Sequence, residues 1–395
     1  MNIQMKCDAG TKLLLILRRP FFYVMRGMRK LDNYLTVGLL GRIRKSSAER
    51  HCDSSKGRLV FILENIGDTL SAAPVLNMLT QNDWVVCTKY NRAVIDMFGF
   101  DNVVVLNRDP GILDFLRFYH ACKDTSFSAS IVLDHTQSGG FGVVSSRFLK
   151  TGKIYSGFGA LPRGDSHVTE ICADDGETDI LSLAKVSIAR EAFFAKGDDL
   201  KHLQKKIGID CGNESGDYHD YIGVHIGGVG SVEYSVSRRY PDQHIFTLVK
   251  MLLARGLKVL ITGDRSDMKR FRKYADGLAG ERGFEDFSGK LDITRLGCLL
   301  KTLKCYITPD NGTLHLAQAV GCKRIYALLG PTDPAIVRGR NTEIISLGLS
   351  CSPCLTFLKF PQQCINSESN ACLRQLHPKS VMDRVMMTLD ESLHK

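Results

Sequence analysis

The stretch RLVFILENIGDTLSAAPVLNML, Arg58 to Leu79, decides how this chain folds. The apolar run Leu59–Leu63 predicts a strand that is buried on both faces. A turn through residues 64–68 follows, and leucine and valine then recur at helical spacing. A buried strand that turns directly into a helix is the first half of a βαβ unit. The turn carries Gly67 and Asp68 at the carboxyl end of the strand, where α/β proteins usually place their chemistry.

Composition limits the number of domains and the class of protein. The chain has 395 residues, of which 44% are hydrophobic, enough for two or three domains. Residues 1–57 hold 12 Lys/Arg and 4 Asp/Glu, so they carry +8 of the net +10. This distribution argues against a nucleic-acid binder and favours a basic N-terminal attachment. Thirteen cysteines, with no evident secretory signal and no apolar run of spanning length, predict a cytoplasmic protein with free thiols.

The basic N-terminal segment has its own pattern. Residues 13–45 interleave apolar, aromatic and basic side chains, with a break at Pro20. Such a pattern is typical of a segment that lies on an anionic membrane face. The alternative is a helical extension packed on the body; we favour the membrane because charge and large apolar side chains are concentrated together. Residues 46–57 are expected to be a linker.

Beyond the linker, strand and helix patterns alternate in two blocks, 58–207 and 221–395, joined by a polar linker at 208–220. This alternation predicts an α/β fold with two doubly wound parallel-sheet domains and a ligand site in a cleft between them. The expected strands are 58–63, 84–88, 102–106, 129–133, 153–159, 221–227, 257–264, 305–310 and 322–330, and the main helices are 69–79, 178–196, 241–256, 293–304 and 311–321.

The second block offers candidate ligand groups at its strand ends. In TPDNGTLHLAQAVG, Asp310–Thr313 open a helix whose free N–H groups favour an anion, although plain N-capping explains them equally. Arg238 precedes another helix, where it would clamp a diphosphate or lie in a solvated basic turn. Asp264 and Asp267 follow a strand, where carboxylates hold ribose hydroxyls or cap the next helix.

In this order the motifs resemble glycosyltransferase family nine, the ADP-heptose:lipopolysaccharide heptosyltransferases. Three positions depart from the family pattern: Arg238 replaces a lysine, Tyr240 a tryptophan and Asn311 a serine or threonine. These differences bear on the donor sugar more than on the reaction class. The resemblance covers about residues 58–385, through ENIGDTLSAAP (64–74), RRYP (238–241), GDRSD (263–267), DNGTLHLAQAVG (310–321), GPT (330–332) and CSPC (351–354).

The resemblance implies a GT-B fold, two Rossmann-like domains facing across a cleft, and an inverting transfer that needs no metal. By analogy Asp68 is the general base, and Gly67 leaves room for the acceptor. The alternative for Asp68 is an N-cap of the helix at 69–79. Arg238 would neutralise the leaving diphosphate. The donor-binding residues that the resemblance implies are Gly227, Gly228, Asp267, Asp310, Asn311, Gly312, Thr313, His315 and, across the cleft, Thr69.

The partners implied are an ADP-sugar donor and a lipid-linked saccharide acceptor on the inner face of a Gram-negative inner membrane. Two other functions stay open at this point. A GT-B nucleotide-sugar epimerase would share the diphosphate site without needing a membrane segment. A membrane-bound scaffold with a degenerate transferase core would need neither activity, but the joint presence of Asp68, Asp310 and His315 argues against degeneration.

Cys351, Cys354, Cys364 and Cys372 form a C-x2-C-x9-C-x7-C pattern. Four thiolates at such spacing can hold a structural zinc ion or an iron–sulfur cluster. The alternative is a loop of reduced thiols. The resemblance supplies cysteines here but no metal role.

Overall fold

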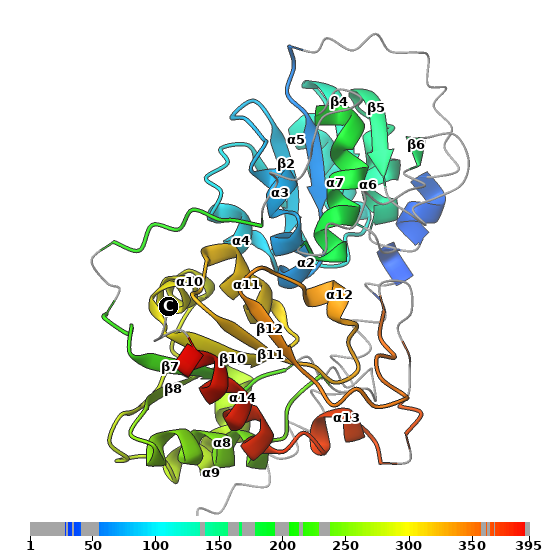
Figure 1. Cartoon of the computed structure of the whole chain (residues 1–395). Helices are drawn as coiled ribbons and strands as arrows, with labels where there is room; N and C mark the ends of the chain where they lie inside the picture. The colour runs from blue at the N-terminus through cyan, green and yellow to red at the C-terminus, as the bar shows by residue number, and fades with distance from the viewer. Residues whose placement is uncertain are drawn as a thin grey trace, which may run out of the picture. The chain divides into compact units, whose positions relative to one another are not determined.

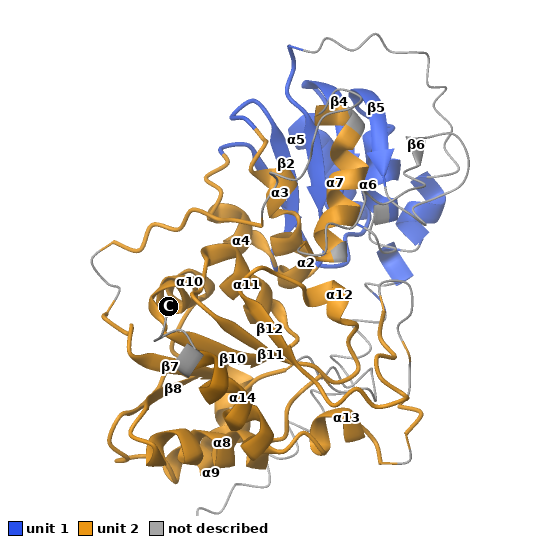
Figure 2. Cartoon of the chain, viewed as in Figure 1, with its two compact units in different colours: residues 1–64, 80–90, 101–169 blue, residues 65–79, 91–100, 170–395 orange. Residues whose placement is uncertain are grey.

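The computed structural model describes residues 28, 31–33, 35–40, 55–134, 139–156, 166–167, 178–193, 205–212, 216–228, 238–356, 361, 364–366 and 368–391. In these residues lie two six-stranded sheets whose strands all run parallel (Figure 1). The chain divides into two compact units, residues 1–64, 80–90 and 101–169, and residues 65–79, 91–100 and 170–395 (Figure 2). The domain boundaries expected from the sequence stay a prediction.

The first sheet is built outward from the apolar run after Arg58. Strand β1 (Leu59–Ile62) is wholly buried and pairs with β2 (Trp84–Thr88) on one side and β4 (Ser126–Val132) on the other. The strand order is β3-β2-β1-β4-β5-β6, that of a doubly wound sheet. The outer strands are β3 (Val103–Leu106), β5 (Lys150–Ser156) and β6 (Ser166–His167).

The second sheet repeats this topology. Its order is β12-β11-β10-β7-β8-β9, so the order reverses between β7 (Tyr221–His225) and β10 (Cys305–Pro309), both of them interior strands. Doubly wound sheets bind their ligands at the carboxyl ends of strands beside this reversal. The other strands are β8 (Lys258–Thr262), β9 (Phe284–Asp286), β11 (Ile325–Leu328) and β12 (Thr342–Ile345). The sequence missed β9 and β12, which are short edge strands with little full burial.

The helices confirm the α/β alternation with one change near the opening motif. The helix expected at 69–79 begins earlier, at Ile66, and is split at Ala72 because Pro74 lies in the first turn of a second helix. The helices with assigned bounds are α2 (Ile66–Ser71), α3 (Ala73–Leu76), α4 (Arg92–Asp96), α5 (Ile112–Cys122), α6 (Gly139–Ser146), α7 (Ile180–Phe193), α8 (Asp242–Ala254), α9 (Arg265–Asp276), α10 (Ile293–Thr302), α11 (Gly312–Val320), α12 (Pro334–Val337), α13 (Ala371–Arg374) and α14 (Pro378–Glu391).

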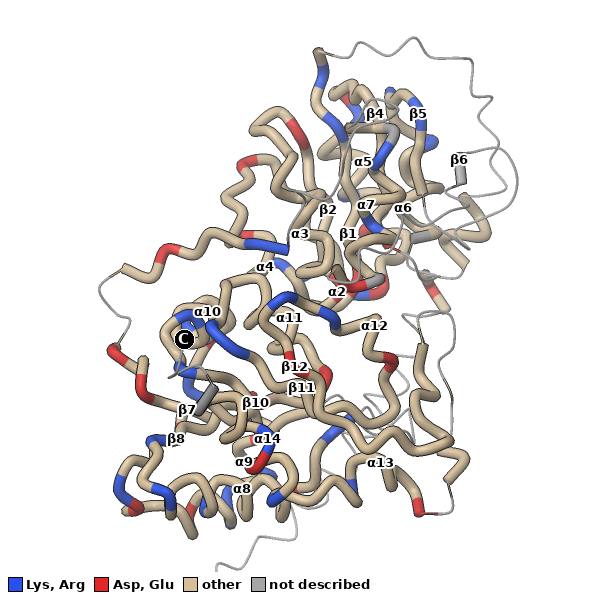
Figure 3. Tube along the Cα trace, in the orientation of Figure 1, with Lys and Arg blue, Asp and Glu red and all other residues tan. Residues whose placement is uncertain are grey.

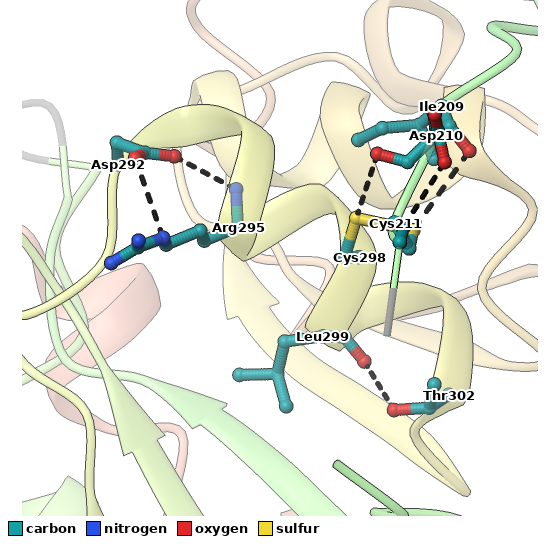
Figure 4. The surroundings of a disulfide bond; sticks show 9 residues. Ile209, Asp210, Cys211, Asp292, Arg295, Cys298, Leu299 and Thr302 are labelled. Carbon is teal, nitrogen blue, oxygen red and sulfur yellow. Dashed lines mark hydrogen bonds and ion pairs between the residues drawn. A yellow bond between two sulfur atoms is a disulfide. The ribbon is translucent and has the colours of Figure 1, made fainter. Parts of the chain in front are cut away.

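One expectation about cysteine chemistry is wrong. The structure joins Cys211, in the polar segment after residue 207, to Cys298 of α10 in a disulfide (Figure 4). Their Cα atoms are 5.5 Å apart, within the range that a disulfide requires. Sequence spacing could not reveal this pair because 87 residues separate the two cysteines. Among the described residues, no second pair of cysteines is joined in a disulfide.

Charge is spread over both units, with basic and acidic residues interspersed along the trace (Figure 3). This agrees with the small net charge of +2 that the sequence leaves for residues 58–395. Within the described part of the chain, no helix combines the length and apolar character that crossing a membrane would require. Most of the basic segment at 13–45 lies outside the described residues.

Candidate functional site

Two helix starts of the second unit pack against each other. A Cβ added to Gly67, in the first turn of α2, would lie 2.9 Å from Cδ2 and 3.5 Å from Nε2 of His315 in α11. A Cβ on Gly312 would likewise lie 3.2 Å from Cγ2 of Ile66. The absent side chain of Gly67 therefore makes room for the imidazole of His315. The room for an acceptor expected at Gly67 stays a prediction.

Asp68 lies in the first turn of α2 and is partly exposed. The N-cap of this helix is Asn65, so Asp68 does not have the capping role that was its alternative. Nδ2 of Asn65 donates a hydrogen bond to Oδ2 of Asp68 over 3.4 Å. The positive end of the helix dipole favours an ionised carboxylate at this position. Asp68 is thus an accessible carboxylate directly after the glycine that contacts His315.

His315 is held from its other side by a buried ion pair. Nζ of Lys205 lies 2.6 Å from Oδ2 of Asp179 and 3.0 Å from Nδ1 of His315, and it donates to Oε1 of Gln318 over 3.1 Å. An ammonium group has only protons to donate, so Nδ1 must accept and Nε2 must carry the ring proton. Burial, and then the charge of Lys205, lower the pKa of His315 to about 4. The imidazole is therefore neutral near pH 7, with its N–H on the Gly67 side.

Asp179 is secured at the start of α7. Its carboxylate accepts hydrogen bonds from the backbone N–H and the hydroxyl of Ser182, both over 2.9 Å. Burial alone would raise the pKa of Asp179, but the charge of Lys205 and the hydrogen bonds from Lys205 and Ser182 hold it below its ordinary value. Asp179 is therefore ionised and is fixed in place beside Lys205.

The second cluster lies at the reversal of the second sheet. Oδ2 of Asp310, directly after β10, accepts from Nη1 of Arg238 over 2.7 Å and from Oγ1 of Thr332 over 2.7 Å. Burial opposes ionisation of Asp310, but the charge of Arg238 and these hydrogen bonds hold its pKa below the ordinary value. The Asp310 side chain is 3% exposed, whereas that of Arg238 is 25% exposed. The guanidinium is thus aimed by a buried carboxylate while keeping an accessible part.

Asn311 has the capping role that was the alternative for this motif. Its Oδ1 accepts from the backbone N–H groups of Thr313 and Leu314, over 2.8 and 3.2 Å. The N–H of Thr313 is therefore already paired within the protein. The hydroxyl of Thr313 accepts from the buried hydroxyl of Tyr306 over 3.2 Å. The backbone N–H groups at 311–313, which were expected to bind a diphosphate, are thus partly used in hydrogen bonds within the protein. Arg238 is therefore the stronger candidate for binding a diphosphate.

Gly227, Gly228 and Asp267 lie close to one another after β7 and β8. A Cβ on Gly227 would overlap the Asp267 carboxylate, and one on Gly228 would lie 2.6 Å from Cα of Arg239. Internal packing requires glycine at both positions, and their expected approach to the nucleotide stays a prediction. Asp267 is 7% exposed, forms a reciprocal capping pair with Asp264, and pairs with Arg270 over 3.1 Å. Burial raises the pKa of Asp267. Its expected bond to a ribose stays a prediction.

Thr69 makes hydrogen bonds within the second unit. Its side chain is fully buried, donates to the carbonyl of Asn65 over 2.9 Å and accepts from Nδ2 of Asn91 over 2.8 Å. Its expected contact with a diphosphate stays a prediction.

The cysteine cluster lies next to the GPT segment that carries Thr332, because Pro331 lines the same cavity. Cys351, Cys354, Cys364 and Cys372 line one small cavity. Among the residues with described positions, however, no group of three or more His, Cys, Asp or Glu side chains is arranged to ligate one metal ion. Burial raises the pKa of Cys372 to about 11. The four thiols as placed do not fit a zinc or iron–sulfur site.

Three residues of the site escaped sequence reasoning. Asp179 and Lys205 lie in polar stretches without a motif, and only the fold brings them to His315. Thr332 belongs to the GPT motif at 330–332, which was recognised, but its bond to Asp310 was not predicted. The motif was the available signal, because a hydroxyl just after β11 lies beside the end of the neighbouring β10.

Comparison with known proteins agrees with this picture. Residues 213–363 match the family model for glycosyltransferase family 9 (heptosyltransferase). The chain is 26% identical over 127 residues to lipooligosaccharide heptosyltransferase 2 of Haemophilus ducreyi, covering 31% of this chain and 36% of that protein. It is 30% identical over 111 residues to lipooligosaccharide heptosyltransferase 2 of Haemophilus influenzae, covering 28% and 32%. The chain thus spans about a third of the length of these curated relatives.

Solved structures show the fold. The E. coli ADP-heptose lps heptosyltransferase II aligns with a TM-score of 0.62 at 15% identity, over 85% of this chain and 99% of that one. The family 9 glycosyltransferase of Veillonella parvula aligns with a TM-score of 0.60 at 15% identity, over 85% and 97%. The two doubly wound sheets are those of the GT-B fold. Residues 213–363 thus match glycosyltransferase family 9, the same family that the sequence motifs resemble.

Proposed function

We propose that this chain is an inverting, metal-independent glycosyltransferase. It would move a heptose or related sugar from an ADP-sugar to a lipopolysaccharide core or another lipid-linked saccharide. The observation that carries the proposal is the Arg238–Asp310 pair, 2.7 Å apart at the reversal of the second sheet. The names of the relatives, lipooligosaccharide heptosyltransferase 2, support the choice of sugar and acceptor.

In the proposed reaction each group has one step. The acceptor hydroxyl attacks the anomeric carbon, its proton passes to Asp68, and the bond from that carbon to the diphosphate oxygen breaks on the opposite side. The accessible part of Arg238 neutralises the charge that develops on the leaving diphosphate. The neutral His315 supplies an N–H donor beside the Asp68 turn. These roles require only groups of the second unit.

Donor recognition is tested by calorimetry. Wild type is titrated with ADP-heptose, a UDP-sugar and a GDP-sugar, and the same is done for Arg238→Ala and for Arg272→Ala, whose side chain is 80% exposed. We expect selective binding of the ADP-sugar, weakened about 10- to 100-fold in Arg238→Ala alone, because a charge-assisted contact to the diphosphate is lost. Preference for another nucleotide would keep the reaction class and change the sugar. Absence of any donor binding would contradict the proposal.

The base is tested by Asp68→Asn, which preserves shape and removes proton acceptance. We expect sugar transfer to fall by about 10²- to 10⁴-fold with donor affinity unchanged. The matched control is Asp276→Asn, an aspartate with a 73% exposed side chain, which should transfer as wild type does. Full transfer by Asp68→Asn would exclude Asp68 as the base. If the donor is consumed and an isomerised sugar nucleotide is formed, the chain is a nucleotide-sugar epimerase. If the donor binds but is not turned over, the chain is a scaffold without catalytic activity.

The cellular placement belongs to the same proposal. A lipid-linked acceptor and a water-soluble ADP-sugar meet at the cytoplasmic face of a membrane. The +8 charge of residues 1–57 suits an anionic lipid surface there. Nothing in the charge distribution favours a nucleic acid as partner.

Metal independence is tested by chelation. Arg238 supplies positive charge for the diphosphate, so transfer measured in excess EDTA should equal transfer in Mg²⁺. Loss of transfer on chelation, restored by added metal, would contradict this step. Metal analysis of the purified chain addresses the cysteine cavity separately, where we expect no stoichiometric zinc or iron because the thiols as placed form no ligand set. One metal ion per chain, lost in Cys351→Ser, would overturn that expectation.

A further inference from the structure

The described part of the N-terminal segment is a helix with an unusual outer face. Residues 28, 31–33 and 35–40 are helical. Met28, Leu31, Leu35 and Leu39 recur at spacings of three and four, which places them on one side of this helix. They are 59%, 56%, 58% and 56% exposed. A helix on the surface of a soluble domain normally exposes polar side chains there.

This helix is nevertheless docked on the first unit by its other side. Thr36 and Leu40 are buried, and Leu40 belongs to the core that contains Phe115 and Phe118 of α5. Nδ2 of Asn33 donates to the carbonyl of Pro110 over 2.7 Å. The helix is therefore packed on the first unit by the side opposite its exposed apolar residues.

The anchoring point lies at the start of α5. Oδ1 of Asp32 accepts from the backbone N–H of Ile112 over 3.4 Å and from the hydroxyl of Thr36 over 3.2 Å. A Cβ on Gly111 would overlap the Asp32 carboxylate. Leu31 and Leu113, each next in sequence to one of these bonded residues, are thereby brought to the same region of the first unit.

Helix α5 has an outer side of the same character. Leu113 and Leu116 are 66% and 53% exposed, whereas Phe115 and Phe118 on the inner side are buried. Arg117 and Lys123 are also exposed, on the same side of the helix as the two leucines by helical spacing. Leucines flanked by basic side chains are the composition that an anionic lipid interface selects.

The clustering is specific to these two helices. Ten large hydrophobic residues are exposed in the described part of the chain, and six of them are on the N-terminal helix and α5. The other four, Tyr90, Leu347, Ile365 and Met387, lie on separate segments, as scattered surface hydrophobics commonly do. We name the six, Met28, Leu31, Leu35, Leu39, Leu113 and Leu116, the leucine face.

We propose that the leucine face is a membrane-docking surface that seats the first unit on a bilayer containing anionic lipid. The leucines enter the interfacial region while Arg117, Lys123 and the +8 charge of residues 1–57 meet the lipid phosphates. The new element is α5, which begins more than fifty residues beyond the basic residues 1–57 and makes docking a property of the folded unit. The reason for membrane binding rests on the proposed function, in which the acceptor is lipid-linked. Membrane binding itself can be measured without any sugar donor or acceptor.

The test is flotation of the full chain with vesicles of phosphatidylcholine alone and of phosphatidylcholine with phosphatidylglycerol. The variant is Leu113→Asp with Leu116→Asp, and the matched control is Ile365→Asp with Met387→Asp, two residues that are 79% and 56% exposed in the second unit. We expect wild type and control to float with the anionic vesicles only. The α5 variant should bind them at least about tenfold more weakly, because two apolar side chains no longer leave water.

Three results would overturn the proposal: equal binding to both vesicle types, no binding, or an α5 variant that binds as wild type does. A wild-type dimer that the α5 variant converts to a monomer would assign the face to a second copy of this chain. Thermal unfolding should be the same for variant and control, since all four sites are exposed. Calorimetry with ADP-heptose separates the two proposals, because an intact leucine face without donor binding contradicts only the proposed function.

Discussion

Nζ of Lys205 lies 3.0 Å from Nδ1 of His315 and 2.6 Å from Oδ2 of Asp179, so a buried ion pair fixes the tautomer of the histidine that touches Gly67. Only 8% of the Lys205 side chain and 2% of the Asp179 side chain are exposed. Water therefore screens this interaction little, and its loss should be visible in both stability and turnover.

Replacing Lys205 by methionine leaves the Asp179 carboxylate buried without its cation. We expect the second unit to lose about 3–5 kcal/mol of unfolding free energy, measured by chemical denaturation. The double variant Lys205→Met with Asp179→Leu should recover most of this loss but not the transfer rate, because His315 still lacks its donor. A double variant with wild-type turnover would show that the pair is only structural.

Stability should fall as the pH is lowered from about 6.5 to about 4. Burial lowers the pKa of both His315 and His225 to about 4, below the ordinary value of 6.5. As the pH is lowered, these histidines take up protons in the unfolded chain before they do so in the folded chain. The free energy of unfolding is therefore highest above pH 6.5 and falls toward pH 4, by about 3 kcal/mol for each histidine.

The measurement is the denaturation midpoint as a function of pH for wild type and His315→Gln. The variant should lose about half of the decline assigned to the two histidines, whereas His219→Gln, at a side chain 64% exposed, should keep all of it. An unchanged profile in His315→Gln would contradict the neutral, buried state of this histidine.

Thr332→Val removes one of the two hydrogen bonds to Asp310 and keeps the shape of the side chain. We expect donor affinity to fall about 3- to 10-fold, since one hydrogen bond to a charged group is lost and Arg238 is aimed less well. Asp310→Asn removes the charge and should cost more than Thr332→Val in the same calorimetric assay. The reverse order would show that Thr332 has a separate role.

Gly67→Ala places a methyl group 2.9 Å from the His315 ring. We expect about 1–3 kcal/mol of destabilisation, together with reduced transfer, because either the ring or the α2 turn must move. Gly208→Ala is the control, since a Cβ there meets nothing within 4 Å. Wild-type stability and turnover in Gly67→Ala would show that the His315 ring can move away from position 67 at little cost.

The fold could be predicted from the sequence because strands and helices are indicated by patterns within short stretches of the chain. Apolar runs such as Leu59–Leu63 and the regular return of helical spacing identified the strands around each reversal, and the parallel sheets follow from that alternation. The sequence motifs also have a chemical rationale. They therefore indicated three candidate site residues without a structure: Asp68, Arg238 and Asp310. For Asn311 the sequence left two interpretations open, and the structure shows the cap.

What the sequence could not supply depends on pairs that lie far apart in the chain. His315 follows Lys205 by 110 positions and Cys298 follows Cys211 by 87, and no local pattern links either pair. The sequence by itself thus determined the alternation of buried strands and helices and the chemistry available at the strand ends. Only the tertiary structure decided which groups meet, that Gly67 faces a histidine and that Leu113 faces water, because burial and pairing depend on the packing of distant segments.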